Sequence, residues 1–265
     1  MPTQNNIVYG MYSGLALLMD IHESIKPNGR GIIFISGSGW RRPTTYDAPQ
    51  LKEGGQFDIW GQAMVEQGYT VFSINHRAVP RFPYPGPIED AQRAMRFVRH
   101  RAADYGIDPD RIGALGGSSG GHLVSALGVF PGEGDADSED PVERETAKAQ
   151  CIVARAAPLY FHDQVGHNLF DDGQGTEVSA ETKAAASPAI HVNAQTAPHL
   201  LLHGDADLQV PYDQAPIMKE YLEKAGVDVE LIRVPGGGHG PTFAGAGDMP
   251  SYIEATINWF NRYLL

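Results

Sequence analysis

The sequence lacks several features that would place the protein outside the ordinary globular class. Cys151 is the only cysteine among 265 residues, so no intramolecular disulfide can form, which fits a reducing compartment. No apolar run approaches the roughly 20 residues that a membrane-spanning helix needs. No basic segment followed by an apolar one opens the chain. These absences predict a cytoplasmic protein without a membrane span, or a secreted or periplasmic one if a signal peptide was removed.

Positive charge is also scarce. Lysine and arginine together number 20 against 32 aspartates and glutamates, which gives a net charge of −12. Nucleic acids and anionic membranes bind basic faces, so the charge argues against both as partners. The hydrophobic fraction of 42% and the charged fraction of 20% are typical of a folded globular protein. We expect one domain over residues 1–265 that acts on a small molecule.

Short apolar runs alternate with amphipathic stretches from residue 31 onward, and this pattern predicts a mostly parallel sheet covered by helices on both faces. The first 25 residues predict one or two antiparallel edge strands. The acidic stretch 131–145 is interpreted as a solvated surface loop, and residues 161–186 as a short lid-like insertion. The expected strands are 31–35, 69–74, 111–115, 151–154, 199–202 and 227–232, and the expected longer helices are 88–105, 212–225 and one that closes the chain.

The segment "GGSSGG" at residues 116–121 matches the pattern G-x-S-x-G in two registers. A predicted strand enters it and a predicted helix leaves it, which is the setting of a nucleophilic serine on a tight strand-to-helix turn. The alternative is a phosphate-binding turn, but no Gly-Lys-Ser/Thr follows and no G-x-G-x-x-G is present. The residues themselves leave Ser118 and Ser119 both open as the nucleophile.

A serine hydroxyl needs a general base and an orienting carboxylate, and in such folds they follow in the order Ser, acid, His. Asp205 and Asp207 come directly after the expected strand 199–202, and His239 lies in a glycine-rich loop after the next strand. No other histidine has this placement. His199 and His203 have a spacing that could bind metal on a helix, but they lie in a strand. We therefore expect no metal and no cofactor.

The stretches "GIDPDRIGALGGSSGGHL" and "INHRAVPRFPYPGPIEDAQRAMRFVR" resemble α/β-hydrolase carboxylesterases. The similar families are the hormone-sensitive-lipase-like esterases and the small capless acetyl- and feruloyl-esterase-like enzymes. The resemblance implies the α/β-hydrolase fold with a minimal lid. It assigns Ser118 as the nucleophile, with Ser119 as the small residue that follows it. The family form H-G-x-x-D-x-x-V-P makes Asp207 the orienting acid and leaves Asp205 to shape the loop, while His239 is the base.

An oxyanion hole needs backbone N–H donors, and one is expected from Ser119, the residue after the nucleophile. The others are expected from Gly37 and Ser38. Related esterases read H-G-G-G-W at this loop, whereas this chain reads Ser-Gly-Ser-Gly-Trp at 36–40. The change puts the backbone angles at Ser38 in question. Trp40 is expected to line the acyl or alcohol pocket, with simple packing as the alternative.

These residues predict a serine carboxylesterase that hydrolyses small, neutral, short-chain acyl esters through an acyl-enzyme. Acetylated carbohydrates and aryl esters are the substrates that the resemblance suggests. One alternative is an amide-cleaving serine hydrolase, either an arylformamidase or a peptidase-like enzyme. Another is a non-catalytic binding protein on the same fold. The aromatic residues of the closing helix, Trp259, Phe260 and Tyr263, would serve either a homodimer contact or the core.

Overall fold

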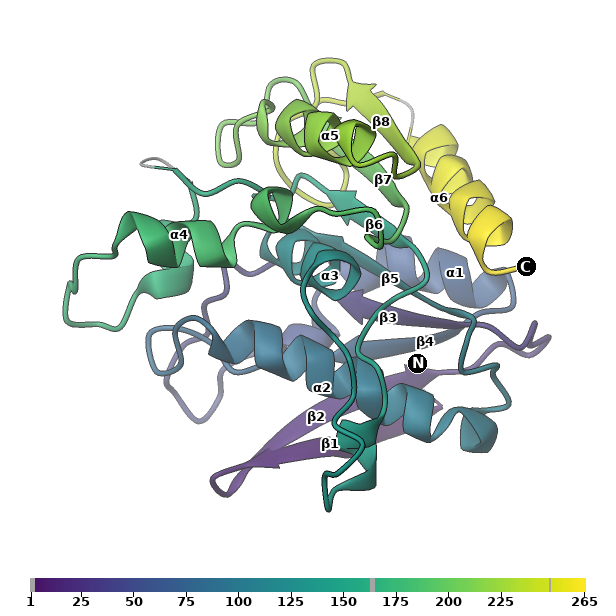
Figure 1. Cartoon of the computed structure of the whole chain (residues 1–265). Helices are drawn as coiled ribbons and strands as arrows, with labels where there is room; N and C mark the ends of the chain where they lie inside the picture. Colours follow the sequence, from purple (N-terminus) through teal and green to yellow (C-terminus); the bar gives the residue numbers. More distant parts are fainter. Residues whose placement is uncertain (1–2, 163–164, 248) are drawn as a thin grey trace.

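The computed structural model describes residues 3–162, 165–247 and 249–265. Within these residues one eight-stranded sheet forms, in the order β1-β2-β4-β3-β5-β6-β7-β8 (Figure 1). Its strands are β1 Gln4–Tyr12, β2 Leu15–His22, β3 Gly31–Ile35, β4 Thr70–Ile74, β5 Ile112–Gly117, β6 Ile152–Arg155, β7 His199–Gly204 and β8 Val229–Val234.

The sheet is antiparallel at one end and parallel elsewhere. β1 pairs antiparallel with β2, and β2 pairs antiparallel with β4. Every pairing from β4 through β3 to β8 is parallel. The predicted parallel sheet with an antiparallel N-terminal edge is therefore confirmed.

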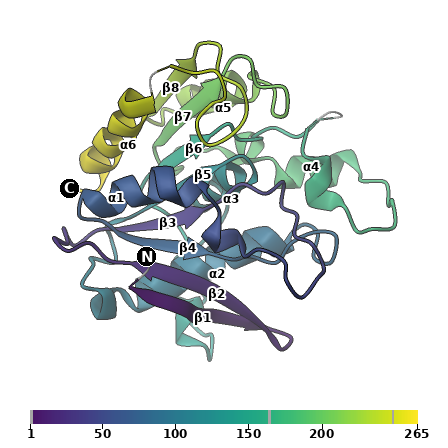
Figure 2. The same ribbon diagram turned by 180° about the vertical axis from the view of Figure 1, so that it is seen from behind.

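Helices cover both faces of the sheet, as predicted. Figure 1 shows α2, α3 and α5 on one face, and Figure 2, from behind, shows α1 and α6 on the other. Among the described residues no helix has the length and apolar character that crossing a membrane requires. The helices are α1 Gln62–Glu66, α2 Gly86–His100, α3 Ser119–Val129, α4 Ala180–Ala186, α5 Gln214–Lys224 and α6 Met249–Tyr263.

Strand β3 is apolar along its whole length, and the burial of both its faces explains why. Successive side chains of a strand point to opposite faces of the sheet. Ile33 and Ile35 pack into the hydrophobic core beneath α2, α3 and α5. Ile32 and Phe34 pack into the second core, beneath α1 and α6. Both faces of this strand are covered, so apolar side chains are favoured at every position.

Two predicted elements differ from the structure. The helix expected over residues 88–105 is α2 followed by a separate 3₁₀ turn, Ala102–Tyr105, which ends at Gly106 with a left-handed φ of 63°. The last strand, expected to be buried on both faces, is the edge strand β8, where only Val234 is buried. An edge strand has one neighbour and less cover than the centre of the sheet, which explains its alternating polar residues.

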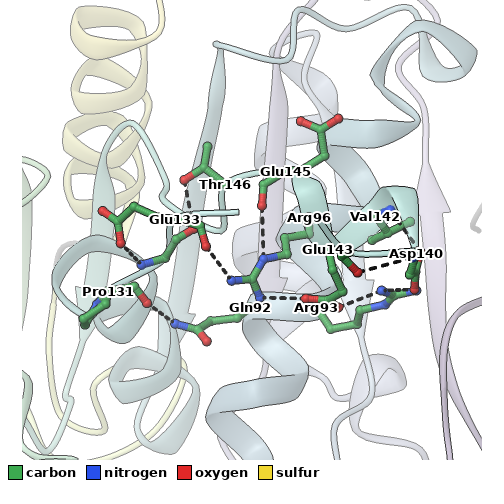
Figure 3. Close-up of polar contacts among 12 residues, drawn as sticks. Gln92, Arg93, Arg96, Pro131, Glu133, Asp140, Val142, Glu143, Glu145 and Thr146 are labelled. Atoms are coloured by element: carbon green, nitrogen blue, oxygen red, sulfur yellow. Dashed lines mark hydrogen bonds and ion pairs between the residues drawn. The ribbon is translucent and has the colours of Figure 1, made fainter. Parts of the chain in front are cut away.

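The acidic loop that starts at Pro131 is tied to helix α2 (Figure 3). The Arg93 guanidinium donates to Asp140 at 2.6 Å and to Glu143 at 2.7 Å. Arg96 donates to the Glu145 carbonyl at 3.1 Å. The segment lies at the surface, as expected, and its charges are used in part to hold it against the helix.

The closing helix contributes aromatic side chains to the core. Trp259 is 3% exposed and Phe260 is fully buried in the core beneath α1 and α6. These two residues therefore offer no exposed face for a second subunit.

Several buried histidines give the fold a defined response to acid. Burial lowers the pKa of His22, His122 and His199 from 6.5 to about 4. Below pH 6.5 these histidines take up protons in the unfolded chain, whereas in the folded protein they stay neutral until the pH approaches about 4. Acid therefore favours unfolding. We expect the melting temperature to fall as the pH is lowered from about 6.5 towards about 4, starting above the range in which carboxylates titrate. Calorimetry at constant ionic strength checks this, and a melting temperature that stays flat between pH 6.5 and 5 would contradict it.

Candidate active site

Ser118 occupies a tight turn between strand β5 and helix α3. Its φ of 55° and ψ of −128° lie outside the favoured regions for a residue with a side chain, and such strain is typical of functional positions. The chain passes so close to the end of β3 that a Cβ on Gly120 would lie 2.0 Å from the Ile35 carbonyl oxygen. The small residues of "GGSSGG" are thus required by the close packing of this turn.

Three side chains that are far apart in the sequence are hydrogen-bonded in series. The His239 Nε2 atom lies 3.0 Å from Ser118 Oγ. The Nδ1 atom of the same ring lies 2.7 Å from Asp207 Oδ2. Because the carboxylate can only accept, Nδ1 carries the proton and donates to Asp207, which leaves Nε2 to accept the hydroxyl proton of Ser118. This is the arrangement in which an imidazole serves as a general base towards a serine.

Asp207 follows strand β7 and is fixed by its surroundings. Its Oδ1 atom accepts backbone N–H bonds from Gln209 at 2.8 Å and Val210 at 2.9 Å. Burial favours the neutral acid, but the hydrogen bonds from His239 and the two amides outweigh it and hold the pKa of Asp207 below its usual value. Asp207 is therefore an anion at neutral pH and can orient the imidazole.

The second carboxylate of this loop, Asp205, points elsewhere. It accepts a bond from Arg233 Nε at 2.7 Å and one from the Gly236 amide at 2.7 Å. These contacts join the loop of Asp207 to the loop of His239. Asp205 is thus placed where a loop-shaping role requires it.

Among the described residues no group of three or more His, Cys, Asp or Glu side chains is arranged to hold a metal ion.

In the loop after β3, one of the amides expected to bind the oxyanion is already hydrogen-bonded within the protein. The Ser38 amide donates to Ser119 Oγ at 2.8 Å, whereas no hydrogen bond joins the amides of Gly37 or Ser119 to any described residue. The positive φ angles of this loop fall on Gly39 and Trp40, at 64° and 56°, and not on Ser38. A serine at 38 is therefore free of backbone strain. Its hydroxyl oxygen is buried without a partner in the described part of the chain.

Trp40 is fixed by a histidine that follows the turn. Its indole N–H donates to His122 Nδ1 at 3.2 Å, and His122 Nε2 donates to the Ala186 carbonyl at 2.9 Å. The tryptophan is 3% exposed and forms part of the wall of a cavity beside Ser118. It is thus both packed and at the site, so the two expectations for Trp40 are compatible.

Two cavities meet at Ser118 and His239. The larger, of about 530 Å³, extends past Trp40 to residues 165–168, which belong to the lid-like insertion expected over 161–186. Residues 163 and 164 of that insertion lie outside the described residues. The smaller cavity, of about 200 Å³, is lined on its far side by Gln56 and Arg155.

Sequence reasoning missed Arg155 and Gln56 at this site. A signal was present for the first, because Arg155 is the one charged residue in the apolar stretch "CIVARAAP". Ligands of parallel α/β sheets bind at the carboxyl ends of the strands, and Arg155 ends β6. Gln56 carried no such signal, because it begins the helical turn Phe57–Gly61 and lies 99 residues away in sequence.

Comparisons with known proteins agree with this geometry. The BD-FAE family model matches residues 19–222. Esterase LipQ of Mycobacterium tuberculosis is 31% identical over 234 residues, which are 76% of this chain and 52% of that protein. An acetyl ester-xyloside bifunctional hydrolase from Caldicellulosiruptor lactoaceticus superposes with a TM-score of 0.83 at 26% identity, covering 98% of this chain and 97% of that one. Esterase 2 of Thermogutta terrifontis gives 0.77 at 25% identity, with 99% and 95% covered.

The chain spans about half the length of the curated relatives it matches, but nearly the whole length of the similar solved structures. The family match covers most of the chain, and the relatives are named as esterases. The resemblance to α/β-hydrolase esterases is thereby confirmed. The chain belongs to the BD-FAE family and has the α/β-hydrolase fold of its esterase relatives.

Proposed function

We propose that this protein is a serine carboxylesterase that hydrolyses short-chain acyl esters through an acyl-enzyme. The observation that carries the proposal is the hydrogen-bonded series Ser118–His239–Asp207 on a strained strand-to-helix turn. The esterase relatives support the same class of reaction.

The geometry supports a mechanism in two halves. Ser118 Oγ attacks the ester carbonyl while its proton passes to His239 Nε2, and Asp207 stabilises the imidazolium. The oxyanion accepts hydrogen bonds from the Gly37 and Ser119 amides, and from the Ser38 amide once it releases Ser119 Oγ. The bond to the alcohol oxygen then breaks, and the alcohol leaves with the proton from Nε2. Water attacks the acyl-enzyme by the same route, releasing the acid and restoring Ser118.

The remaining features of the proposal concern size and setting. The small cavity beside Gly37 leaves room for a short group on one side of the scissile bond. The insertion 161–186 acts as a minimal lid over the larger cavity, with Trp40 on its wall. We also propose that residues 1–265 form one catalytic domain, that the protein works in the cytoplasm on a small-molecule ester, and that it needs no cofactor.

Acyl-chain length tests this proposal directly. We expect 4-nitrophenyl acetate to be hydrolysed with a higher kcat/KM than 4-nitrophenyl octanoate, because a short insertion cannot cover a long acyl chain. The amide 4-nitroacetanilide, which has the same acyl group and ring, serves as the matched control for amide cleavage. Equal rates for the two esters would overturn the short-chain proposal. Faster cleavage of the anilide would favour an amidase, and no turnover of any of the three would favour a binding protein.

We propose that the buried hydroxyl of Ser38 donates a further hydrogen bond to the oxyanion. Losing one preorganised donor typically costs about 10²- to 10³-fold in kcat. This hydroxyl would supplement the amides, so we expect Ser38→Ala and Ser38→Gly each to lower kcat by about 10- to 100-fold. Both substitutions keep the backbone N–H, and steady-state kinetics on a short-chain ester measures the effect. Full activity in both variants would show that only the backbone matters at this position.

A further inference from the structure

Arg155 is a buried cation that no carboxylate of the described residues neutralises. It is 1% exposed, and it forms no ion pair with any described residue. Its only side-chain hydrogen bond with the described residues runs from Nη2 to Gln56 Oε1 at 3.1 Å. Its guanidinium carbon lies 4.1 Å from the centre of the Trp60 ring, and its Nε is buried without a partner. A buried charge left unpaired is costly, so folded proteins normally pair it.

The guanidinium groups of the other two buried arginines of the described chain are each bonded to several acceptors. Arg77 is paired with Asp90 and Glu89. Arg99 donates to the backbone carbonyls of Pro109 and Lys148. Arg155 is therefore the exception, and its exceptional position is at the active site.

The guanidinium lies directly beside the nucleophile's turn. Gly117, the residue before Ser118, is the register partner of Arg155 in the sheet. A Cβ on Gly117 would lie 2.6 Å from Arg155 Nη2 and 2.8 Å from Gln56 Oε1. The Ser118 amide donates to the Arg155 carbonyl at 2.8 Å. The guanidinium, Gln56, Ser118 and His239 line the same cavity of about 200 Å³.

This cavity has the chemistry to bind a carboxylate. A guanidinium presents its N–H groups in a planar fork that matches the two oxygens of a carboxylate. Nη1 of Arg155 makes no hydrogen bond with the described residues, so a donor is available there. Burial lowers the pKa of Arg155 to about 9, which leaves it charged at neutral pH and short of a compensating anion.

We propose that the ester substrate carries a carboxylate, which Arg155 binds in the small cavity while Ser118 attacks the ester carbonyl a few bonds away. This rests on the proposed esterase function and names the substrate class for the same site. It replaces the expectation that the ester substrate is neutral. For a substrate inside the cavity, the nearby charge of Arg155 outweighs the negative charge of the distant surface, because salt screens the latter.

Isosteric ester pairs test this with the unmodified protein. Monomethyl succinate and methyl succinamate differ only in a carboxylate against a carboxamide on the acyl side. 4-Acetoxybenzoate and 4-acetoxybenzamide make the same comparison on the alcohol side. A hydrogen-bonded charge pair is worth about 10- to 100-fold in binding, so we expect kcat/KM to favour the carboxylate in one pair by at least about tenfold. The pair that shows the preference identifies the side of the ester that enters the cavity.

Substitution of Arg155 then assigns the preference to this side chain. Arg155→Met keeps an unbranched chain against Trp60 but removes the charge. In this variant kcat/KM is expected to be equal for the carboxylate and carboxamide esters of the pair. Arg155→Lys is expected to retain part of the preference for the carboxylate ester. The ratio of the two kcat/KM values does not depend on the fraction of folded enzyme, so loss of stability cannot imitate the result. Arg233→Met removes an exposed charge that pairs with Asp205 and is expected to leave the ratio unchanged.

Two results would overturn the inference. One is the absence of a carboxylate preference in both pairs while the neutral esters are hydrolysed, which leaves the esterase function standing. The other is a preference that survives in Arg155→Met. Failure to hydrolyse any ester, neutral or charged, would instead count against the proposed function itself.

Discussion

Ser118→Ala is expected to lower kcat for ester hydrolysis by about 10⁴- to 10⁶-fold, because it removes the atom that forms the acyl-enzyme. The hydroxyl of Ser118 is the group hydrogen-bonded to His239, and alanine retains the Cβ that the strained turn already accommodates. The melting temperature should therefore change little. Steady-state kinetics with a short-chain 4-nitrophenyl ester, together with a thermal melt, measures both quantities.

Ser119→Ala is the matched control, because the two serines are adjacent in the same small-residue turn. It keeps the backbone N–H that is proposed to bind the oxyanion and removes only the hydroxyl that accepts from the Ser38 amide. We expect kcat to stay within about tenfold of the unmodified enzyme. Near-normal turnover in Ser118→Ala, with a collapse in Ser119→Ala, would reverse the assignment of the nucleophile.

Asp207→Asn is expected to lower kcat by about 10³- to 10⁴-fold while leaving the site nearly unchanged in shape. An asparagine amide can donate to His239 Nδ1, which moves the ring proton to Nε2 and removes the acceptor that Ser118 needs. The negative charge that stabilises the imidazolium is lost as well. The pH profile of kcat/KM should change with the substitution, because the carboxylate and the imidazole act together.

Asp205→Asn provides a control on the same loop. Its carboxylate holds Arg233 and the Gly236 amide and does not touch His239. We expect this variant to retain kcat within about tenfold. It should lose some stability, but only a little, because surface ion pairs contribute little to stability. If Asp205→Asn lost as much activity as Asp207→Asn, the effect would lie in the shape of the loop rather than in the carboxylate that orients the imidazole.

Much of the fold could be predicted from local pattern. The apolar run 31–35 became β3 with unchanged bounds, since a central strand is buried on both faces and no other residues fit. The strand after residue 111 runs two residues further than expected, to Gly117. Glycines read as turn residues from the sequence, but here they also extend the strand because close neighbours leave no room for side chains.

The order of the site residues was likewise available from the sequence. Each of Asp207 and His239 follows a strand, and parallel strands end at the same edge of the sheet, so their meeting at Ser118 could be expected. The roles assigned to the three residues stay proposals until the variants are measured.

Contacts between distant side chains were beyond the reach of the sequence. The pairing of Gln56 with Arg155 depends on how the helical turn that leads into α1 crosses the end of β6. The bond from the Ser38 amide to Ser119 Oγ depends on the distance between the oxyanion loop and the turn. Neither has a periodic or motif signal, because both are set by the packing of segments far apart in the chain.

The site of covalent capture by a serine-directed fluorophosphonate tests the central claim most directly. Such a reagent reacts with a serine that a neighbouring base has activated and leaves a stable adduct, which tandem mass spectrometry of the peptide containing residues 112–129 can place on one residue. The account predicts one adduct per chain, on Ser118, absent from both Ser118→Ala and His239→Ala. An adduct on Ser119, or an unmodified peptide from protein that still turns over esters, would contradict it.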